Sequence, residues 1–266
     1  VDAMAAAWLP VMSAAEVSGA LGEVVVPSLA AAGHSPIGLA LLLRGGRTAG
    51  PLPATLLRGP LRGLAARPEW QIDWQHAVEG RGRPEGLHDA LRAAPHLGEP
   101  GSNFIFPLMT QAQQPGLADR LLGPVLADRY DVPAALHTLT RVAAWSMIHD
   151  DPAQAPYGWS HALTMPQGVM ALAGAGVSAR TALAVAATHL LGFRVAYGSQ
   201  SLPASIEPIV ENVTAAELAT EASAHEDAHL VKYTLACLHA AADDPEFAGL
   251  YLHAAASLRD WWRVNG

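Results

Sequence analysis

Two histidines and a lysine recur along one short stretch of the sequence, SAHEDAHLVKYT, residues 223–234. His225, His229 and Lys232 are spaced four and then three residues apart. At about 100° per residue, a helix would place these three side chains within a sector of roughly 60°. Lys232 is also the only lysine in the chain. The spacing therefore predicts a site in which imidazole and amine nitrogens lie together.

Three kinds of chemistry suit this cluster. The imidazoles and the amine can be structural, with each polar atom bonded to a neighbouring carbonyl or carboxylate. Histidines four residues apart on one helical face can instead offer two nitrogens to one metal ion. A lysine whose pKa is lowered by burial can act as an acid or base. The spacing leaves all three open, with His225, His229 and Lys232 as the candidate catalytic residues.

The same segment satisfies the H-E-x-x-H pattern of zinc proteases. In that interpretation Glu226 is the general base, and a downstream histidine such as His239 or His253 supplies the third ligand. The pattern gives no role to Asp227 or Lys232, and nothing else in the sequence indicates a peptide-binding cleft. A protease is therefore the less favoured interpretation.

Residues 215–242 are expected to form one long helix that carries the cluster. Thr214 and Glu217 have the T-x-x-E spacing of a capping box at its start. Leucine, valine, alanine and cysteine cover most directions around this helix, which indicates a central helix that is buried nearly all round. Imidazoles and an amine in such a place need polar partners or a metal, because an unpaired buried polar group is costly.

The chain as a whole is predicted to be one all-α domain, residues 1–266, built as a helical bundle. From about residue 132 onward alanine and leucine dominate the sequence. Pro133 marks one helix start, and Asp244 followed by Pro245 marks another.

The first half of the chain is less regular. Two helices are expected to meet near Gly33 and Pro36, and the second is expected to end at Gly45 and Gly46. Gly, Pro and Arg crowd the residues after this point, so the segment from Thr48 to Pro100 predicts short helices and loops.

Composition narrows the class of protein. The chain is 51% hydrophobic, and 24 acidic against 16 basic side chains give a formal net charge of -8. Without a basic cluster, no nucleic-acid partner is expected. The apolar runs are broken by Gly or Pro before the roughly 18 residues that a bilayer span needs, so no membrane partner is expected. A single cysteine, Cys237, and the lack of a recognisable secretory leader favour the cytoplasm.

Three segments resemble sequences of the questin oxidase-like family. HEDAHLVKYTLACLHAAADDPEFAGLYLHAAASL, residues 225–258, is similar to a C-terminal signature in which H-x-x-x-H-x-x-K precedes an Ala/Leu-rich helix. GWSHALTMPQGVMAL, residues 158–172, resembles the family's W-x-H-x-L-T-x-P-Q segment. AGHSPIGLALLL, residues 32–43, resembles its N-terminal histidine motif. The similarity extends over about residues 158–262 and includes the predicted cluster.

This resemblance implies oxygen-dependent carbon–carbon bond cleavage, of the dioxygenase or Baeyer–Villiger type. The substrate would be a polycyclic aromatic quinone or hydroquinone, such as an anthraquinone of polyketide secondary metabolism, and dioxygen would be the second small-molecule partner. The resemblance also implies an Fe(II) centre held by four histidines and a carboxylated lysine. Carried onto this sequence, the metal ligands are His34, His161, His225, His229 and Lys232. Imidazole and carboxylate-like oxygen ligands suit Fe(II).

Two alternatives to the iron enzyme stay open. A cofactorless oxygenase would use a histidine as general base on the same class of substrate. A non-catalytic helical module would bind an aromatic metabolite without converting it. No G-x-G-x-x-G or P-loop motif is present, which disfavours a tightly held flavin or nicotinamide. Trp145 and Trp159 are the candidate substrate-binding walls, His189 is the reserve ligand, and a homodimer is compatible with the sequence.

Overall fold

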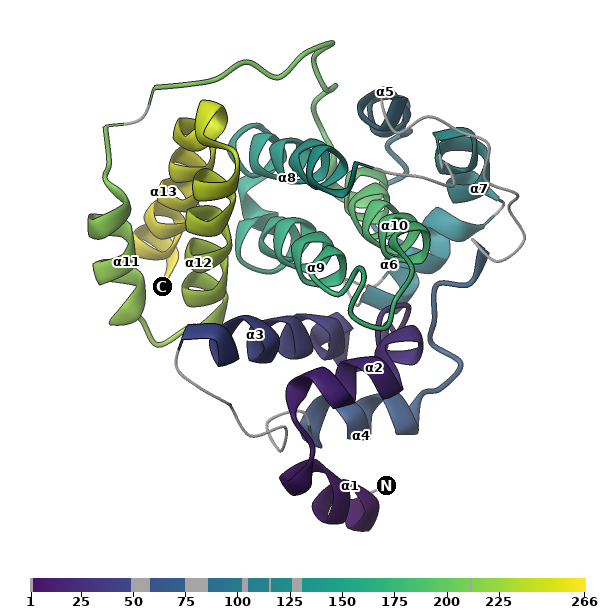
Figure 1. The fold of residues 1–266 in the computed structure, drawn as a ribbon. Coiled ribbons are helices and arrows are strands. Elements are labelled where there is room, and N and C mark those ends of the chain that lie inside the picture. The colour runs from purple at the N-terminus through teal and green to yellow at the C-terminus, as the bar shows by residue number, and fades with distance from the viewer. Residues whose placement is uncertain are drawn as a thin grey trace.

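The computed structural model describes residues 2–48, 58–74, 86–101, 105–114, 116–125, 131–210 and 212–266. Within these ranges the protein consists of helices and connecting turns, with isolated β-bridges and no β-strand. The predicted all-α bundle is confirmed (Figure 1). Its α-helices are α1 (Asp2–Trp8), α2 (Ala14–Val25), α3 (His34–Thr48), α4 (Arg58–Ala66), α5 (Leu87–Arg92), α6 (Ile105–Gln113), α7 (Leu117–Leu122), α8 (Val132–His149), α9 (Ser160–Met170), α10 (Ala179–Tyr197), α11 (Ala215–Ser223), α12 (Ala228–Asp243) and α13 (Ala248–Asn265).

Helices α9 and α10 form the centre of the bundle. Every residue of α9 is buried, and so is every residue of α10 from Ala182 to Tyr197. Helices α3, α8 and α12 pack against α9, α6 packs against α10, and α13 packs against α8 and α12 (Figure 1). One hydrophobic core includes side chains from α2 through α13. Burial of each large apolar side chain contributes about 1.5–3 kcal/mol, and this core is the main source of stability.

The prediction of a single central helix over residues 215–242 is wrong. Helix α11 ends at Ser223 and α12 begins at Ala228, so the segment that carries the cluster is divided. The side chain of Asp227 accepts a hydrogen bond of 2.7 Å from the backbone N–H of His229. A capping carboxylate of this kind favours a new helix start. The break lies inside the histidine cluster and changes which residues can meet.

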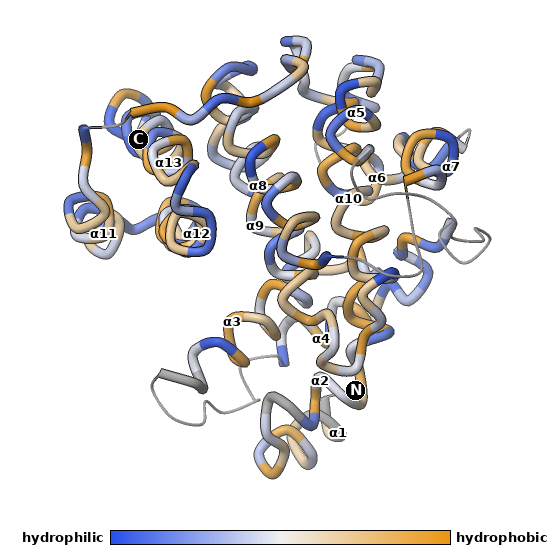
Figure 2. The backbone as a smooth tube through the Cα atoms, turned by 45° about the horizontal axis from the view of Figure 1, so that its top comes forward, coloured by the Kyte–Doolittle hydropathy of each residue, from blue (hydrophilic) through white to orange (hydrophobic). Residues whose placement is uncertain are grey.

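Helix α12 is amphipathic and is not buried all round. Val231 and Leu235 are 39% and 40% exposed, while Leu230 and Tyr233 on the same helix are buried. In Figure 2, α12 carries both hydrophilic and hydrophobic residues around its circumference. Among the described residues, no helix combines the length and the apolar character needed to cross a bilayer.

The helix starts predicted from capping residues are confirmed. Thr214 and Glu217 form a reciprocal capping box, which begins α11. Pro133 lies in the first turn of α8. Asp244 precedes a 3-10 turn, Pro245–Phe247, that leads into α13. Local capping chemistry therefore fixes these boundaries, as expected where a side chain or a proline ring satisfies or removes the unpaired N–H groups of a first turn.

The first half of the chain agrees in part with expectation. Helices α2 and α3 meet at the corner Ala30–Gly33, and short helices connected by turns follow. Helix α3 runs through Gly45 and Gly46 to Thr48, so its predicted end is wrong. A glycine weakens a helix by only about 1 kcal/mol relative to alanine and does not by itself end it. Within the predicted irregular segment, residues 49–57 and 75–85 lie outside the described residues.

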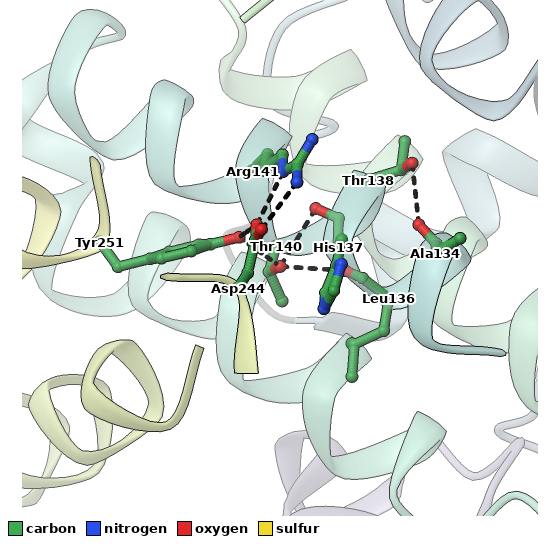
Figure 3. A network of polar contacts seen from close by, with 8 residues as sticks. All are labelled: Ala134, Leu136, His137, Thr138, Thr140, Arg141, Asp244 and Tyr251. Carbon is green, nitrogen blue, oxygen red and sulfur yellow. Dashed lines mark hydrogen bonds and ion pairs between the residues drawn. The ribbon is translucent and has the colours of Figure 1, made fainter. Parts of the chain in front are cut away.

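An ion pair between the partly buried Arg141 and the buried Asp244 connects α8 to the junction between α12 and α13 (Figure 3). The Asp244 carboxylate accepts hydrogen bonds from Nε and Nη2 of Arg141, each 2.7 Å long, and a third of 2.8 Å from the Tyr251 hydroxyl. The Thr140 hydroxyl lies 3.0 Å from that of Tyr251. Burial raises the pKa of Asp244, but the hydrogen bonds from Arg141 and Tyr251 outweigh it and hold the pKa below its usual value.

Removal of this carboxylate is expected to destabilise the fold. Asp244→Ala leaves Arg141 and Tyr251 without their shared acceptor and should lower the free energy of unfolding by about 3 kcal/mol at neutral pH. Because the folded pKa of Asp244 lies below the unfolded one, its contribution is present above about pH 4 and is lost as pH falls through the folded pKa. Urea denaturation should therefore show a smaller difference between variant and wild type at about pH 3 than at about pH 7.

The matched control is Asp89→Ala, which removes an exposed carboxylate paired with Arg92. It should cost less than about 1 kcal/mol, because exposed ion pairs contribute little. Equal denaturation midpoints for the Asp244 and Asp89 variants at neutral pH would show that the network in Figure 3 adds no stability.

Candidate metal centre

Three histidines from separate parts of the chain meet at one point of the bundle. His34 is the first residue of α3, and His161 and His229 lie in the first turns of α9 and α12. One ring nitrogen from each lies within 4.8 Å of the other two. Nε2 of His34 and Nε2 of His161 are 3.5 Å apart, and the ring centroids of His161 and His229 are 5.1 Å apart. The predicted convergence of these three residues is thus present in the structure.

All three rings hold the same tautomer. Nδ1–H of His34 donates to the carbonyl of Ala31 at 2.7 Å, and Nδ1–H of His161 donates to the carbonyl of Tyr157. Nδ1 of His229 lies 3.0 Å from a carboxylate oxygen of Asp227, to which it donates. With the proton fixed on Nδ1, each neutral ring carries a lone pair on Nε2, the form of nitrogen that binds a metal. This is the arrangement in which histidines bind metals, with the second nitrogen oriented by an oxygen acceptor.

The electrostatics of the cluster favour a bound cation. Burial, followed by the nearby Lys232, lowers the pKa of His34, His161 and His229, so the rings are neutral near physiological pH. Bare Nε2 atoms of His34 and His161 that face each other at 3.5 Å repel unless a positive group lies beside them. Two nitrogens on one tetrahedral metal lie about 3.3 Å apart, so this separation fits a shared ion after a shift of a few tenths of an ångström. The donor set therefore fits a divalent transition metal.

Lys232 completes the cluster from α12. Its Nζ lies 2.8 Å from Nε2 of His161 and donates to that bare nitrogen. Burial lowers the pKa of Lys232 to about 7, with only a partial opposing effect from the charge of Asp227. A large fraction of this amine is therefore neutral near physiological pH, as required of a base, a nucleophile or a precursor of a carbamate. The predicted association of a lysine with the histidines is present.

A strained corner positions His34. Ala31 and Ala32 have φ values of 51° and 53°, in the left-handed region, and Gly33 follows with φ of 70°. The positive φ of Gly33 favours glycine there, whereas a Cβ at this position would meet only the movable end of the Met165 side chain. Non-glycine residues with positive φ cost about 1–3 kcal/mol each and are concentrated at functional sites. The same corner turns the Ala31 carbonyl back onto the ring of His34.

A π-helical turn positions His161. Residues Ala155–Trp159 form this turn immediately before α9, and π turns are frequent at functional sites. Gly158 lies within the turn, where a Cβ would sit 3.0 Å from the ring of Tyr197. The turn places the Tyr157 carbonyl against Nδ1 of His161, while the Tyr157 ring lies edge-on to His229 with centroids 4.8 Å apart.

The structure does not bring His225 into the cluster. Nδ1 of His225 accepts a hydrogen bond of 3.1 Å from the backbone N–H of Asp227, so its tautomer is opposite to that of the three clustered rings. Its ring packs against Trp262, with centroids 5.3 Å apart. The reason is the end of α11, which places His225 before the break and outside the helical spacing that would align it with His229.

The tryptophans predicted as substrate walls lie elsewhere. Trp159 is fully buried in the core, and its indole N–H donates to the carbonyl of Asp151 at 3.3 Å. Trp145 packs on the ring of His149, with centroids 4.6 Å apart. The reserve ligand His189 is fully buried in the middle of α10 and is not among the clustered residues.

A cleft opens from the histidine cluster toward solvent. It encloses about 970 Å³, and its walls combine aromatic side chains with a polar rim. Glu99 at the rim accepts a hydrogen bond of 2.9 Å from the side-chain amide of Gln154. The residues that line the cleft besides the three histidines are Ala32, Glu99, Ile105, Ala153, Gln154, Tyr157, Gly158, Phe193 and Tyr197. Of these, Phe193 and Tyr197 share one face of α10 at a spacing of four, a signal that is indistinguishable from ordinary core in the sequence.

Asp227 is expected to tune the affinity of the site through His229. One carboxylate oxygen accepts from both the backbone N–H and Nδ1 of His229. Asp227→Asn keeps an oxygen for the helix cap but removes the charge that orients the ring, so metal affinity should fall about 10–100-fold with little change in stability. Competition with a chromophoric chelator measures the affinity. Glu226→Gln, at the neighbouring exposed carboxylate, is the control, and equal affinities for both variants would contradict the role of Asp227.

Fold and site together define an all-α protein with a partly buried cluster of three histidines and one lysine at an aromatic-walled cleft. Comparison with protein-family models, with curated proteins and with solved structures finds no match for this chain. The resemblance of its motifs to the questin oxidase-like family therefore stays a prediction, and the functional argument rests on the site itself.

Proposed function

We propose that this chain is an iron-dependent oxygenase of the questin oxidase-like type. It would cleave a carbon–carbon bond of a polycyclic aromatic quinone or hydroquinone, such as an anthraquinone of polyketide secondary metabolism. The observation that supports this most is the shared tautomer of His34, His161 and His229, which directs three bare nitrogens to one point. Neutral imidazoles with an added oxygen ligand suit Fe(II) and leave positions for small molecules.

The chain's own residues would hold and complete the centre. His34, His161 and His229 would bind the ion, and the oxygen acceptors of their Nδ1–H groups would keep the rings oriented. The neutral amine of Lys232 would add to carbon dioxide with release of one proton, which gives a carbamate whose oxygen is a fourth protein ligand. Bound Fe(II) would supply the one-electron chemistry by which dioxygen reacts with a closed-shell aromatic molecule.

The cleft would orient a flat aromatic substrate. Tyr157, Phe193 and Tyr197 offer ring surfaces beside the histidines, and aromatic side chains stack on or pack edge-on to other rings. Burial, with the nearby charge of Glu99, raises the pKa of Tyr197 to about 12, so its hydroxyl stays protonated and can donate to a quinone carbonyl. Glu99 itself can accept from a phenolic hydroxyl.

A cofactorless oxygenase is the second candidate, supported by the contact between Lys232 and His161. An amine with a pKa of about 7 that lies 2.8 Å from a bare imidazole nitrogen can accept the proton of a hydroquinone hydroxyl without any metal. A non-catalytic module that binds an aromatic metabolite would use the same cleft and would need neither the metal nor the base.

Dioxygen uptake with a hydroxyanthraquinone, supplied both as the quinone and as its hydroquinone, separates these candidates. The iron oxygenase requires uptake and ring cleavage by iron-loaded protein and neither by protein treated with a chelator. Equal turnover after chelation would favour the cofactorless enzyme, and tight binding with no dioxygen uptake would favour the binding module.

Lys232 variants are expected to lose activity in a pattern that depends on its role. Lys232→Ala and Lys232→Arg should both fail in the iron oxygenase, because neither a methyl group nor a guanidinium can form the carbamate. Short carboxylic acids added to Lys232→Ala should restore part of the activity if an oxygen ligand is what is missing. Rescue by a small amine, with none by a carboxylic acid, would point to Lys232 as a base.

A cytoplasmic location and a homodimer belong to the same proposal. The single cysteine, Cys237, is buried and free, as expected for a chain that forms no internal disulfide. Sedimentation velocity over a range of protein concentrations measures the assembly, and a monomer throughout would remove the homodimer from the proposal.

A further inference from the structure

A second hollow is lined by Lys232, which is not among the residues that line the cleft. It is a groove between α3, α9 and α12 with a volume of about 370 Å³, against about 970 Å³ for the cleft, both including space open to solvent. Its walls include Ile37, Ala40 and Leu41 from α3, Gly168 from α9, and Lys232, Leu235 and Ala236 from α12. Lys232 lines the groove and His161 lines the cleft, so their 2.8 Å contact lies between the two hollows.

The surface of the groove is almost entirely apolar. Besides Lys232, its polar side chains are Arg44, Thr164, Gln167 and His239. The Thr164 hydroxyl donates to the carbonyl of Ser160 at 2.9 Å, and the Gln167 amide donates to the carbonyl of Ala236 at 3.0 Å. Nη1 of Arg44 donates to Nδ1 of His239, so these two side chains are partners of each other. The surface that remains toward the space is mostly methyl and methylene groups. A narrow apolar space is poorly hydrated and takes up small apolar molecules in place of water.

The groove has less than half the volume of the cleft. A Cβ on Gly168 would lie 3.1 Å from the Cα of Ile37, so α3 and α9 are in close contact along one side. Leu41 and Leu235, each 40% exposed, lie where the groove meets solvent. A small diatomic molecule passes such a space, whereas a polycyclic ring system fits the larger, aromatic-walled cleft.

We propose that the groove between α3, α9 and α12 is a dioxygen passage that leads to the contact between Lys232 and His161. The inference rests on the proposed function, which makes dioxygen a substrate. A flat aromatic molecule in the cleft would cover the histidines on that side. A separate apolar entrance beside Lys232 then lets dioxygen reach the same centre without displacing the aromatic substrate.

Dioxygen is paramagnetic, so its position can be measured without catalysis. In methyl NMR spectra recorded under dioxygen pressure, the methyl groups of Ala40, Leu235 and Ala236 should relax faster than that of Val210, which is 94% exposed and reports contact with dissolved gas. Ala236→Phe should remove the effect at Ala40 by filling the groove. Ala242→Phe, at an exposed alanine of the same helix, is the matched control and should leave the effect unchanged.

Leu235→Trp gives a second test at an exposed position, where folding tolerates a larger side chain. It should reduce the dioxygen-induced relaxation of the Ala40 methyl group several-fold. The passage would be overturned if dioxygen sped the relaxation of the groove methyl groups no more than that of Val210. It would also be overturned if the faster relaxation at Ala40 persisted in both Ala236→Phe and Leu235→Trp.

Failure of the proposed function gives a different result: the groove methyl groups respond to dioxygen, but no substrate causes dioxygen uptake. In active protein, the groove variants should need several-fold more dioxygen for half-maximal rate, with an unchanged rate at saturation.

Discussion

Alanine in place of His161 or His229 is expected to remove tight metal binding, whereas His225→Ala is expected to leave it intact. His161 and His229 each bring a ring nitrogen into the cluster, and Nδ1 of each donates to an oxygen acceptor. His225 uses its Nδ1 as the acceptor for the backbone N–H of Asp227 and packs on Trp262. Because an outer partner alone changes affinity about 10–100-fold, loss of a direct ligand should cost at least about 100-fold.

Metal analysis of protein purified without chelator gives the first measurement, with close to one divalent ion per chain expected for wild type and for His225→Ala. Titration of the metal-free proteins with Fe(II) under anaerobic conditions gives the affinities. Thermal unfolding with and without metal adds a readout independent of activity, since an ion that binds only the folded state stabilises it. His225→Ala with the same loss as His229→Ala would return His225 to the ligand set and would require α11 and α12 to rearrange on binding.

The spacing of residues in the sequence predicted the part of the cluster that lies within one turn of a single helix. His229 and Lys232 are three residues apart within α12, and that helix does present both toward His161. His225 lies at an equally regular spacing, but the spacing rule assumes an unbroken helix. Asp227 both follows His225 and caps the next helix, and an aspartate inside an expected helix is a stop signal that competes with periodicity.

The long-range part of the site could be predicted only from the resemblance. His34 and His161 are 195 and 68 residues away from His229, and nothing in their local sequence states that they meet it. The corner that aims His34 uses alanines in the left-handed region, which propensity argues against. The π turn before His161 is likewise a deviation from regular helix. The corner before α3 and the π turn before α9 both depend on packing against α9 and α10, so rules based on local sequence do not predict them.

The aromatic residues of the cleft were missed for a related reason. The sequence indicates tryptophans as substrate walls, but Trp159 lies in the core and the cleft is lined by Tyr157, Phe193 and Tyr197. The central position of α10 explains this result. A helix buried on all sides carries apolar residues in every direction, so its sequence does not reveal which ones border a cleft.

The second large effect is expected at His189, in the centre of α10. The side chain is fully buried, and neither ring nitrogen has a hydrogen-bond partner among the described residues. A buried polar group without a partner costs about 1–3 kcal/mol. His189→Leu replaces the ring with an apolar side chain of similar volume and should therefore raise the free energy of unfolding by about 1–3 kcal/mol at neutral pH.

The same substitution should change the response to acid. Burial lowers the pKa of His189 to about 3, so the folded protein keeps the ring neutral. The unfolded chain takes up a proton below about pH 6.5, so acid favours unfolding as pH falls from there toward the folded pKa. Between about pH 6.5 and the folded pKa, this one residue should lower the free energy of unfolding of wild type by about 4–5 kcal/mol. His189→Leu should show none of this decrease.

Urea denaturation from about pH 7 down to about pH 4 measures both effects. His189→Met is a second variant, with an unbranched side chain, in case leucine does not fit the space left by the ring. His96→Leu, at an exposed histidine, is the control and should keep the slope of wild type. If His189→Leu instead lowers stability at neutral pH and keeps the wild-type slope, the imidazole must have a polar partner in solution. The buried ring would then belong to a hydrogen-bonded network in the core of α10, in place of the isolated apolar setting described here.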